Sequence, residues 1–110
     1  FVSTDDPLES KRFGNMIIGK GAVIRAIDSS NVVPTEALRR LTEIARQRNI
    51  PLQAGSSRGG NDGSVFVPRG SVDIPLSWPG AYAHSFIEKI DRGDLEALSD
   101  LVLAIVHDWK

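Results

Sequence analysis

One histidine stands where a metal ligand or a base can work. His84 follows an apolar, strand-like segment, adjoins Ser85, and is followed closely by Glu88 and Asp91. A neutral imidazole that leaves the end of a strand is well placed to bind a metal ion. Either carboxylate can orient the ring by accepting a hydrogen bond from its second nitrogen. From these residues alone, a metal ligand, a base and an ordinary loop residue all remain open for His84.

A glycine-rich loop is the second candidate. Residues 56–63 read "SSRGGNDG". Backbone N–H groups in such a loop, with Arg58 nearby, can hold an anion or a substrate carboxylate. Asp62 can cap a short helix, bind a ligand at the edge of the sheet, or do both. The Gly-Lys-Ser/Thr ending of a phosphate-binding P-loop is absent, so a flexible connector is the alternative interpretation.

Other chemistry finds less support in the sequence. Asp5 and Asp6 are adjacent carboxylates, but neighbours in an extended segment point to opposite sides. Ser85 adjoins a histidine but lacks the G-x-S-x-G pattern of a nucleophile. The chain has no cysteine, so a metal site must use histidine and carboxylates.

The composition describes one ordinary domain. The chain has 110 residues, 41% of them hydrophobic and 25% charged, with a formal net charge of -1. That length suits a single domain with a modest core. The sequence has no basic cluster of the kind that indicates a nucleic-acid-binding surface. No apolar run reaches the roughly 20 residues of a membrane span. We expect a cytoplasmic protein.

Strand and helix patterns alternate along the chain. Three β-branched or apolar stretches predict strands at Ala22–Asp28, Ile50–Ala54 and Val72–Ser77. Three periodic or capped stretches predict helices from Pro34 to just before Asn49, from Asp62 through Phe66, and from Asp91 to about His107. This alternation indicates an α/β fold. Since ligands gather beyond the carboxyl ends of strands, the loops at 55–63 and 78–91 are expected side by side at one edge of the sheet.

Local spacing predicts three finer details. Pro34 is expected in the first turn of its helix, where its missing N–H costs nothing. Glu36 and Arg40 are expected to form an i,i+4 ion pair. Asp91 and Asp94 are spaced almost as a capping box at the start of the last helix.

Several segments in their order resemble a known family. "GKGAVIRAIDSSNVVP", "RGGNDGSVFVPRGSVDIPLSWP" and "YAHSFIEKID" are similar to the C-terminal part of the dinuclear-zinc aminopeptidases of metallopeptidase family forty-two. The most specific element is Tyr-x-His-Ser-x-x-Glu-x-x-Asp, which begins here at Tyr82. The resemblance implies a three-layer α/β sandwich with a mixed sheet and flanking helices. Residues 1–110 are then the C-terminal part of one catalytic domain.

The resemblance also implies roles for residues. His84 corresponds to the last zinc ligand, with Glu88 and Asp91 as the groups that orient it. The residues of a substrate-side wall are Gly59, Gly60 and Asp62. No catalytic residue falls in this chain, because the catalytic glutamate and the other ligands precede it. The cofactor is Zn²⁺, two ions per complete site, with cobalt or manganese as alternatives.

The same resemblance names partners. They are a peptide substrate, the N-terminal half of the same protein, and further copies of the chain in a shell of twelve subunits. Phe1 and Val2 look like the end of a strand, so we expect a fragment that is inactive alone. The alternative function is a non-catalytic α/β interaction module. It is favoured by the lone ligand-type histidine and by Ala81, which stands where the family usually has arginine.

Overall fold

The computed structural model of this chain describes residues 16–110. The strand end predicted at Phe1–Val2 and the candidate carboxylates Asp5 and Asp6 lie outside the described residues. Along the chain, the elements are β1 (Ala22–Ile27), α2 (Thr35–Gln47), β2 (Leu52–Ser56), the 3-10 helix η1 (Asp62–Arg69), β3 (Leu76–Ser77), β4 (Gly80–Ala81), β5 (Lys89–Ile90) and α3 (Arg92–Asp108).

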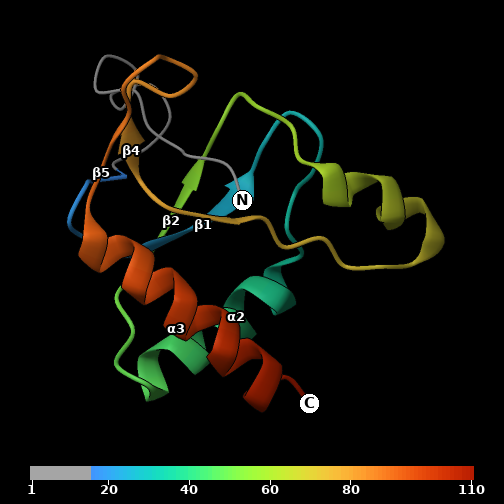
Figure 1. Cartoon of the computed structure of the whole chain (residues 1–110). Helices are drawn as coiled ribbons and strands as arrows, with labels where there is room; N and C mark the ends of the chain where they lie inside the picture. The colour runs from blue at the N-terminus through green and yellow to red at the C-terminus, as the bar shows by residue number, and fades with distance from the viewer. Residues whose placement is uncertain (1–15) are drawn as a thin grey trace.

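The predicted mixed α/β architecture is confirmed. The main sheet has the order β2-β1-β3, in which β1 is parallel to β2 and antiparallel to β3. Helices α2 and α3 both lie against the same face of this sheet (Figure 1). The described residues thus supply two of the three layers that were expected. No helix within residues 16–110 is long and apolar enough to cross a membrane.

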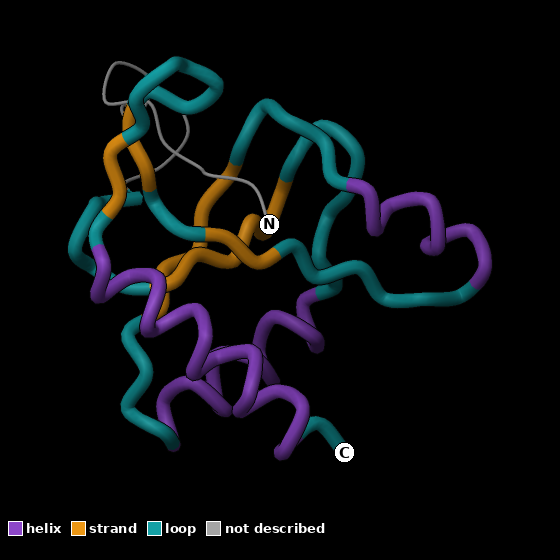
Figure 2. Tube along the Cα trace, in the orientation of Figure 1, coloured by secondary structure: helices purple, strands orange, loops and turns teal. Residues whose placement is uncertain are grey.

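The core lies between the sheet and the two helices. Its centre contains small and branched apolar side chains: Ala22, Ala45, Ala97, Leu98 and Leu101. Small residues here allow β1, α2 and α3 to approach closely, and partly buried side chains from β2 and β3 close the sides. Helix η1 contributes no buried residue and lies apart from α2 and α3 at the side of the molecule (Figure 2). This core therefore depends on β1 and the two long helices.

Helix α2 differs from its prediction in two details. Pro34 is the N-cap, outside the first turn, and its carbonyl accepts the N–H of Leu38 at 3.0 Å. Glu36 pairs with Arg39 at 2.6 Å, so the predicted pair with Arg40 is wrong. The guanidinium of Arg40 instead lies 4.7 Å from the ring centre of Trp109. A cation above the face of an aromatic ring is attracted to it. Glu36 can form its ion pair at i,i+3 as well as at i,i+4.

Strand β3 is shorter than predicted because of one proline. The prediction covered Val72–Ser77, but only Leu76 and Ser77 belong to the strand. The carbonyl of Pro75 accepts the N–H of Arg25 at 2.9 Å. Proline has no N–H to return the paired bond. The ladder between β1 and β3 therefore ends at this residue.

A buried carboxylate fixes the start of β1. The side chain of Asp94 is almost fully buried, at 1% exposure, and accepts the N–H groups of Gly19 and Gly21 at 2.7 Å each. The capping-box prediction is therefore correct only for Asp91, which accepts the N–H of Gly93 at 2.7 Å and caps α3. Asp94 uses its carboxylate to join the first turn of α3 to the turn before β1.

A second buried carboxylate fixes the end of β1. One oxygen of Asp28 accepts the N–H groups of Ser30 at 2.8 Å and Asn31 at 2.9 Å, and the other accepts the side-chain amide of Asn61 at 2.8 Å. Arg25 lies 3.4 Å from Asp28 and also donates to the carbonyl of Gly59. Burial alone raises the pKa of Asp28, but the bonds from Asn61 and Ser30 and the charge of Arg25 outweigh it, and the pKa is lowered.

Replacing Asp94 with alanine should lower the free energy of unfolding by about 3 kcal/mol, because hydrogen bonds to a charged group contribute about 1.5–3 kcal/mol each. The N–H of Gly21, which is buried, would be left without its acceptor. Urea unfolding at neutral pH measures the change. Asp100→Ala, an exposed aspartate on the same helix, is the control and should change stability little. Equal losses in the two variants would contradict this role for Asp94.

Asp28→Asn should destabilise the chain by about 3 kcal/mol at neutral pH, because it leaves the buried Arg25 without its counter-charge. The variant should also change the pH dependence of stability. The folded-state pKa of Asp28 lies below its ordinary value of 3.8. The stabilisation is therefore present above about pH 4 and is lost as the pH falls through the folded-state pKa. Urea unfolding at several pH values should show a shallower acid-side loss in the variant, and an unchanged acid limb would argue against the proposed linkage.

Candidate functional site

His84 lies in a hairpin loop between β4 and β5. The two strands pair antiparallel, with Gly80 opposite Ile90 and Ala81 opposite Lys89. His84 is exposed, and its ring makes no hydrogen bond with another residue of the described segment. Its backbone has a left-handed φ of 63°, which is uncommon for a residue other than glycine. Among residues 16–110, the hairpin therefore leaves the imidazole without a hydrogen-bond partner.

Neither carboxylate predicted to orient the ring is hydrogen-bonded to the imidazole in the described residues. Glu88 accepts the backbone N–H of His84 at 2.8 Å, so it contacts the main chain of the histidine. The side chain of Asp91 caps α3 through Gly93 and Asp94. Among the predicted residues of this motif, the structure thus brings Glu88 to His84 and uses Asp91 to start the next helix.

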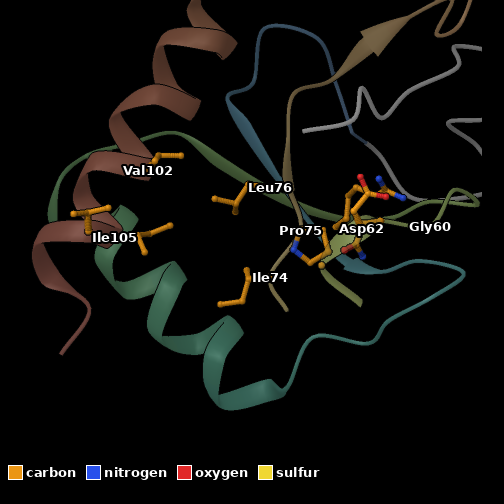
Figure 3. Close-up of a pocket in the computed structure, with 11 residues that line it drawn as sticks. Gly60, Asp62, Ile74, Pro75, Leu76, Val102 and Ile105 are labelled. Atoms are coloured by element: carbon orange, nitrogen blue, oxygen red, sulfur yellow. The ribbon is translucent and has the colours of Figure 1, made fainter. Parts of the chain in front are cut away.

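The glycine-rich loop borders a cavity of about 490 Å³. Residues 60–63 form one wall. The opposite wall is apolar and comes from β3 and α3, with Leu76, Val102 and Ile105 grouped together (Figure 3). Asp62 is exposed and belongs to the polar side of the lining. It does not cap η1, because the N-cap is Asn61 and no side chain makes a capping bond there. An apolar group with a neighbouring cation would suit this lining.

The hairpin that carries His84 and the glycine-rich loop leave the sheet at opposite ends of β1, so the expectation that both loops leave the same edge of the sheet is wrong. Strand β2 is parallel to β1 and ends near Ile27, where the carbonyl of Gly59 accepts the N–H of Ser29 at 3.3 Å. Strand β3 runs the other way, with Ser77 opposite Val23. The chain therefore leaves β3 beside the start of β1, and the hairpin with His84 emerges there (Figure 1).

The donor set fits a metal only in part. An exposed imidazole that makes no hydrogen bond to the described part of the chain is a suitable single ligand. Within residues 16–110, however, no group of three or more histidine, aspartate or glutamate side chains could hold a metal ion. A catalytic zinc takes about three protein ligands. A metal bound at His84 therefore needs donors from outside the described residues.

The structural roles of three residues near the candidate sites were not predicted from the sequence. Arg25 is buried at 1% exposure and contacts both Asp28 and the Gly59 carbonyl. Asn61 joins the glycine-rich loop to Asp28 through its amide. Ser85 contacts two carbonyl groups of the His84 loop. The sequence did carry a signal for Arg25. It is a charged residue inside the apolar stretch "AVIRAID", and an aspartate follows it three residues later.

Comparisons with solved structures show that the fold is shared with known proteins. Solved structures similar to the chain include the dodecameric PhTET1-12s assembly, at 36% identity and a TM-score of 0.84. The TET1 peptidase of Pyrococcus horikoshii, which assembles into a tetrahedron or an octahedral shell, matches at 36% and 0.82. An aminopeptidase of the archaeon Desulfurococcus kamchatkensis matches at 26% and 0.82.

These matches cover 96%, 94% and 98% of this chain but only 31%, 30% and 32% of the respective solved chains. The chain thus spans about a third of their length. The family model of the M42 glutamyl aminopeptidases matches residues 1–101, nearly the whole sequence. With this match, the identity to the archaeal structures and the shared fold, the chain belongs to the M42 glutamyl aminopeptidase family.

Proposed function

We propose that this chain is the C-terminal part of the catalytic domain of a zinc-dependent aminopeptidase, which removes N-terminal residues from peptides. The match of residues 1–101 to the M42 glutamyl aminopeptidase family carries the proposal. Two of the similar solved structures are named a peptidase and an aminopeptidase, which supports the same reaction. Because the chain spans about a third of such proteins, the remaining machinery comes from sequence outside it.

In this proposal His84 is one zinc ligand. Its imidazole is exposed at the tip of a hairpin, where donors from another part of the protein can approach. The other ligands and the general base lie outside residues 16–110. Two bound zinc ions would polarise the peptide carbonyl and activate a water molecule. The contribution of this chain is to hold an imidazole nitrogen in place for the metal.

The glycine-rich loop with Gly59, Gly60 and Asp62 would contact the peptide substrate. An aminopeptidase cleaves the first peptide bond, so the rest of the peptide extends away from the metal. A cavity with an apolar wall and an exposed carboxylate would suit a later side chain of that peptide.

We also propose a homo-oligomeric, cytoplasmic enzyme. The similar solved structures include a dodecamer and a protein that forms tetrahedral or octahedral shells. Such an assembly would use this chain as part of each subunit, with the N-terminal portion of the same protein as its partner.

The 110-residue chain alone should bind almost no zinc and should not hydrolyse amino-acid amides, since it supplies a single ligand. In the complete protein, His84→Ala should lower activity by at least about 100-fold, because even groups that only orient a ligand contribute about 10–100-fold. Elemental analysis of bound metal and an amide-hydrolysis assay measure both. His107→Ala is the matched control, since His107 is the other histidine, exposed in the last turn of α3.

Stoichiometric zinc in the 110-residue chain that disappears in His84→Ala would show that this segment builds a complete site without the missing ligands. Full activity and full metal content of His84→Ala in the complete protein would overturn the proposed ligand.

A further inference from the structure

The loop that carries His84 is held in an unfavourable backbone conformation. Tyr82 and His84 have φ values of 65° and 63°, in the left-handed region that residues other than glycine rarely occupy. Both side chains are exposed, Tyr82 at 60%, so packing in a core does not impose these angles. Such conformations persist where the surrounding contacts hold them, and they cluster at functional sites.

Two side chains of the same loop supply those contacts. The carboxylate of Glu88 accepts the N–H of His84 at 2.8 Å. The hydroxyl of Ser85 lies 2.5 Å from the carbonyl oxygen of Tyr82 and 2.8 Å from that of Ile87, and can donate its proton to either. The N–H of Ser85 also donates to the Tyr82 carbonyl at 3.1 Å. Ser85 therefore acts on the residues before and after it, and Glu88 acts on the histidine itself.

We propose that Ser85 and Glu88 form a backbone clamp, which fixes the left-handed turn at Tyr82 and His84 and so orients the His84 imidazole before a metal binds. This inference rests on the proposed function, in which His84 is a zinc ligand. Both side chains are hydrogen-bonded to the backbone of the loop and not to the imidazole, so both are positioning residues. A ligand that is already ordered loses less conformational freedom on binding, which raises affinity.

The clamp makes a specific prediction about Glu88. If Glu88 acts through its hydrogen bond to the backbone, Glu88→Gln should preserve zinc affinity within about 3-fold, because its amide oxygen accepts the same bond. Glu88→Ala and Ser85→Ala should each weaken zinc affinity by about 10–100-fold, the range for groups that orient a metal ligand. If Glu88 acts instead through its charge on the imidazole, the glutamine variant should lose as much affinity as the alanine variant.

The experiment measures zinc affinity of the complete protein by competition with a chromophoric chelator. Amide hydrogen exchange at His84 is measured in the metal-free protein, where it reports the bond to Glu88 directly. Exchange should accelerate in Glu88→Ala and stay slow in Glu88→Gln. Ser99→Ala, an exposed serine on α3, is the matched control for Ser85→Ala and should leave zinc affinity unchanged.

A rescue variant separates the clamp from a general loss of structure. Glycine adopts left-handed angles without steric cost, so Tyr82→Gly should make the contacts of Ser85 less necessary. The double variant Tyr82→Gly with Ser85→Ala should therefore bind zinc more tightly than Ser85→Ala alone. The absence of any rescue would contradict the strain on which the clamp depends.

The outcomes distinguish this inference from the function beneath it. Loss of zinc in His84→Ala with unchanged affinity in Ser85→Ala and Glu88→Ala would overturn the clamp and leave the proposed ligand intact. Equal losses in Glu88→Gln and Glu88→Ala would overturn the backbone role of Glu88. Unchanged zinc affinity in His84→Ala would overturn the proposed zinc ligand. It would also overturn the clamp, because the clamp is proposed to orient that ligand.

Discussion

The contact between Asp94 and the turn before β1 determines where the rest of the structure lies. Two backbone N–H groups at the start of a buried strand need acceptors, and a carboxylate can serve both at once. Here that carboxylate belongs to α3, and both bonds are 2.7 Å long. The contact fixes the beginning of α3 against the beginning of β1. The hairpin with His84 ends immediately before α3, so the same contact also determines where that hairpin leaves the body of the molecule.

The two ends of β1 are organised in the same way but serve different loops. Asp94 secures the end next to the His84 hairpin, and Asp28 secures the end next to the glycine-rich loop. A buried carboxylate is stable only when donors surround it, and each of these has backbone donors in adjacent turns. The loops themselves remain largely exposed. Rigid strand ends thus position exposed loops, which is the usual arrangement for residues that meet a ligand.

Much of the fold could be predicted from the spacing of apolar residues, because the buried positions of a helix or strand recur at a regular interval in the sequence. The spacing of Leu41 and Ile44 in α2, and of Leu98 and Leu101 in α3, predicted helices that the structure contains. The direction of a strand, and hydrogen bonds between residues far apart in the chain, leave no such pattern in the sequence. The direction of β3 depends on a connection through η1, which does not cross the sheet as a packed helix would. The partners of Asp94 lie more than 70 residues away, beyond the reach of any local capping rule.

The left-handed backbone at His84 also limits which metal-binding side chains this position can carry. Histidine, aspartate and asparagine adopt such angles several-fold more often than other residues with a side chain. Aspartate is therefore the one other common zinc ligand that suits the φ of 63°, whereas glutamate and cysteine share no such preference. A ligand exchange at this position, in evolution or by design, would replace nitrogen with oxygen. In the proposed zinc site, that exchange would shift the metal preference away from zinc and toward metals that favour oxygen donors, such as manganese.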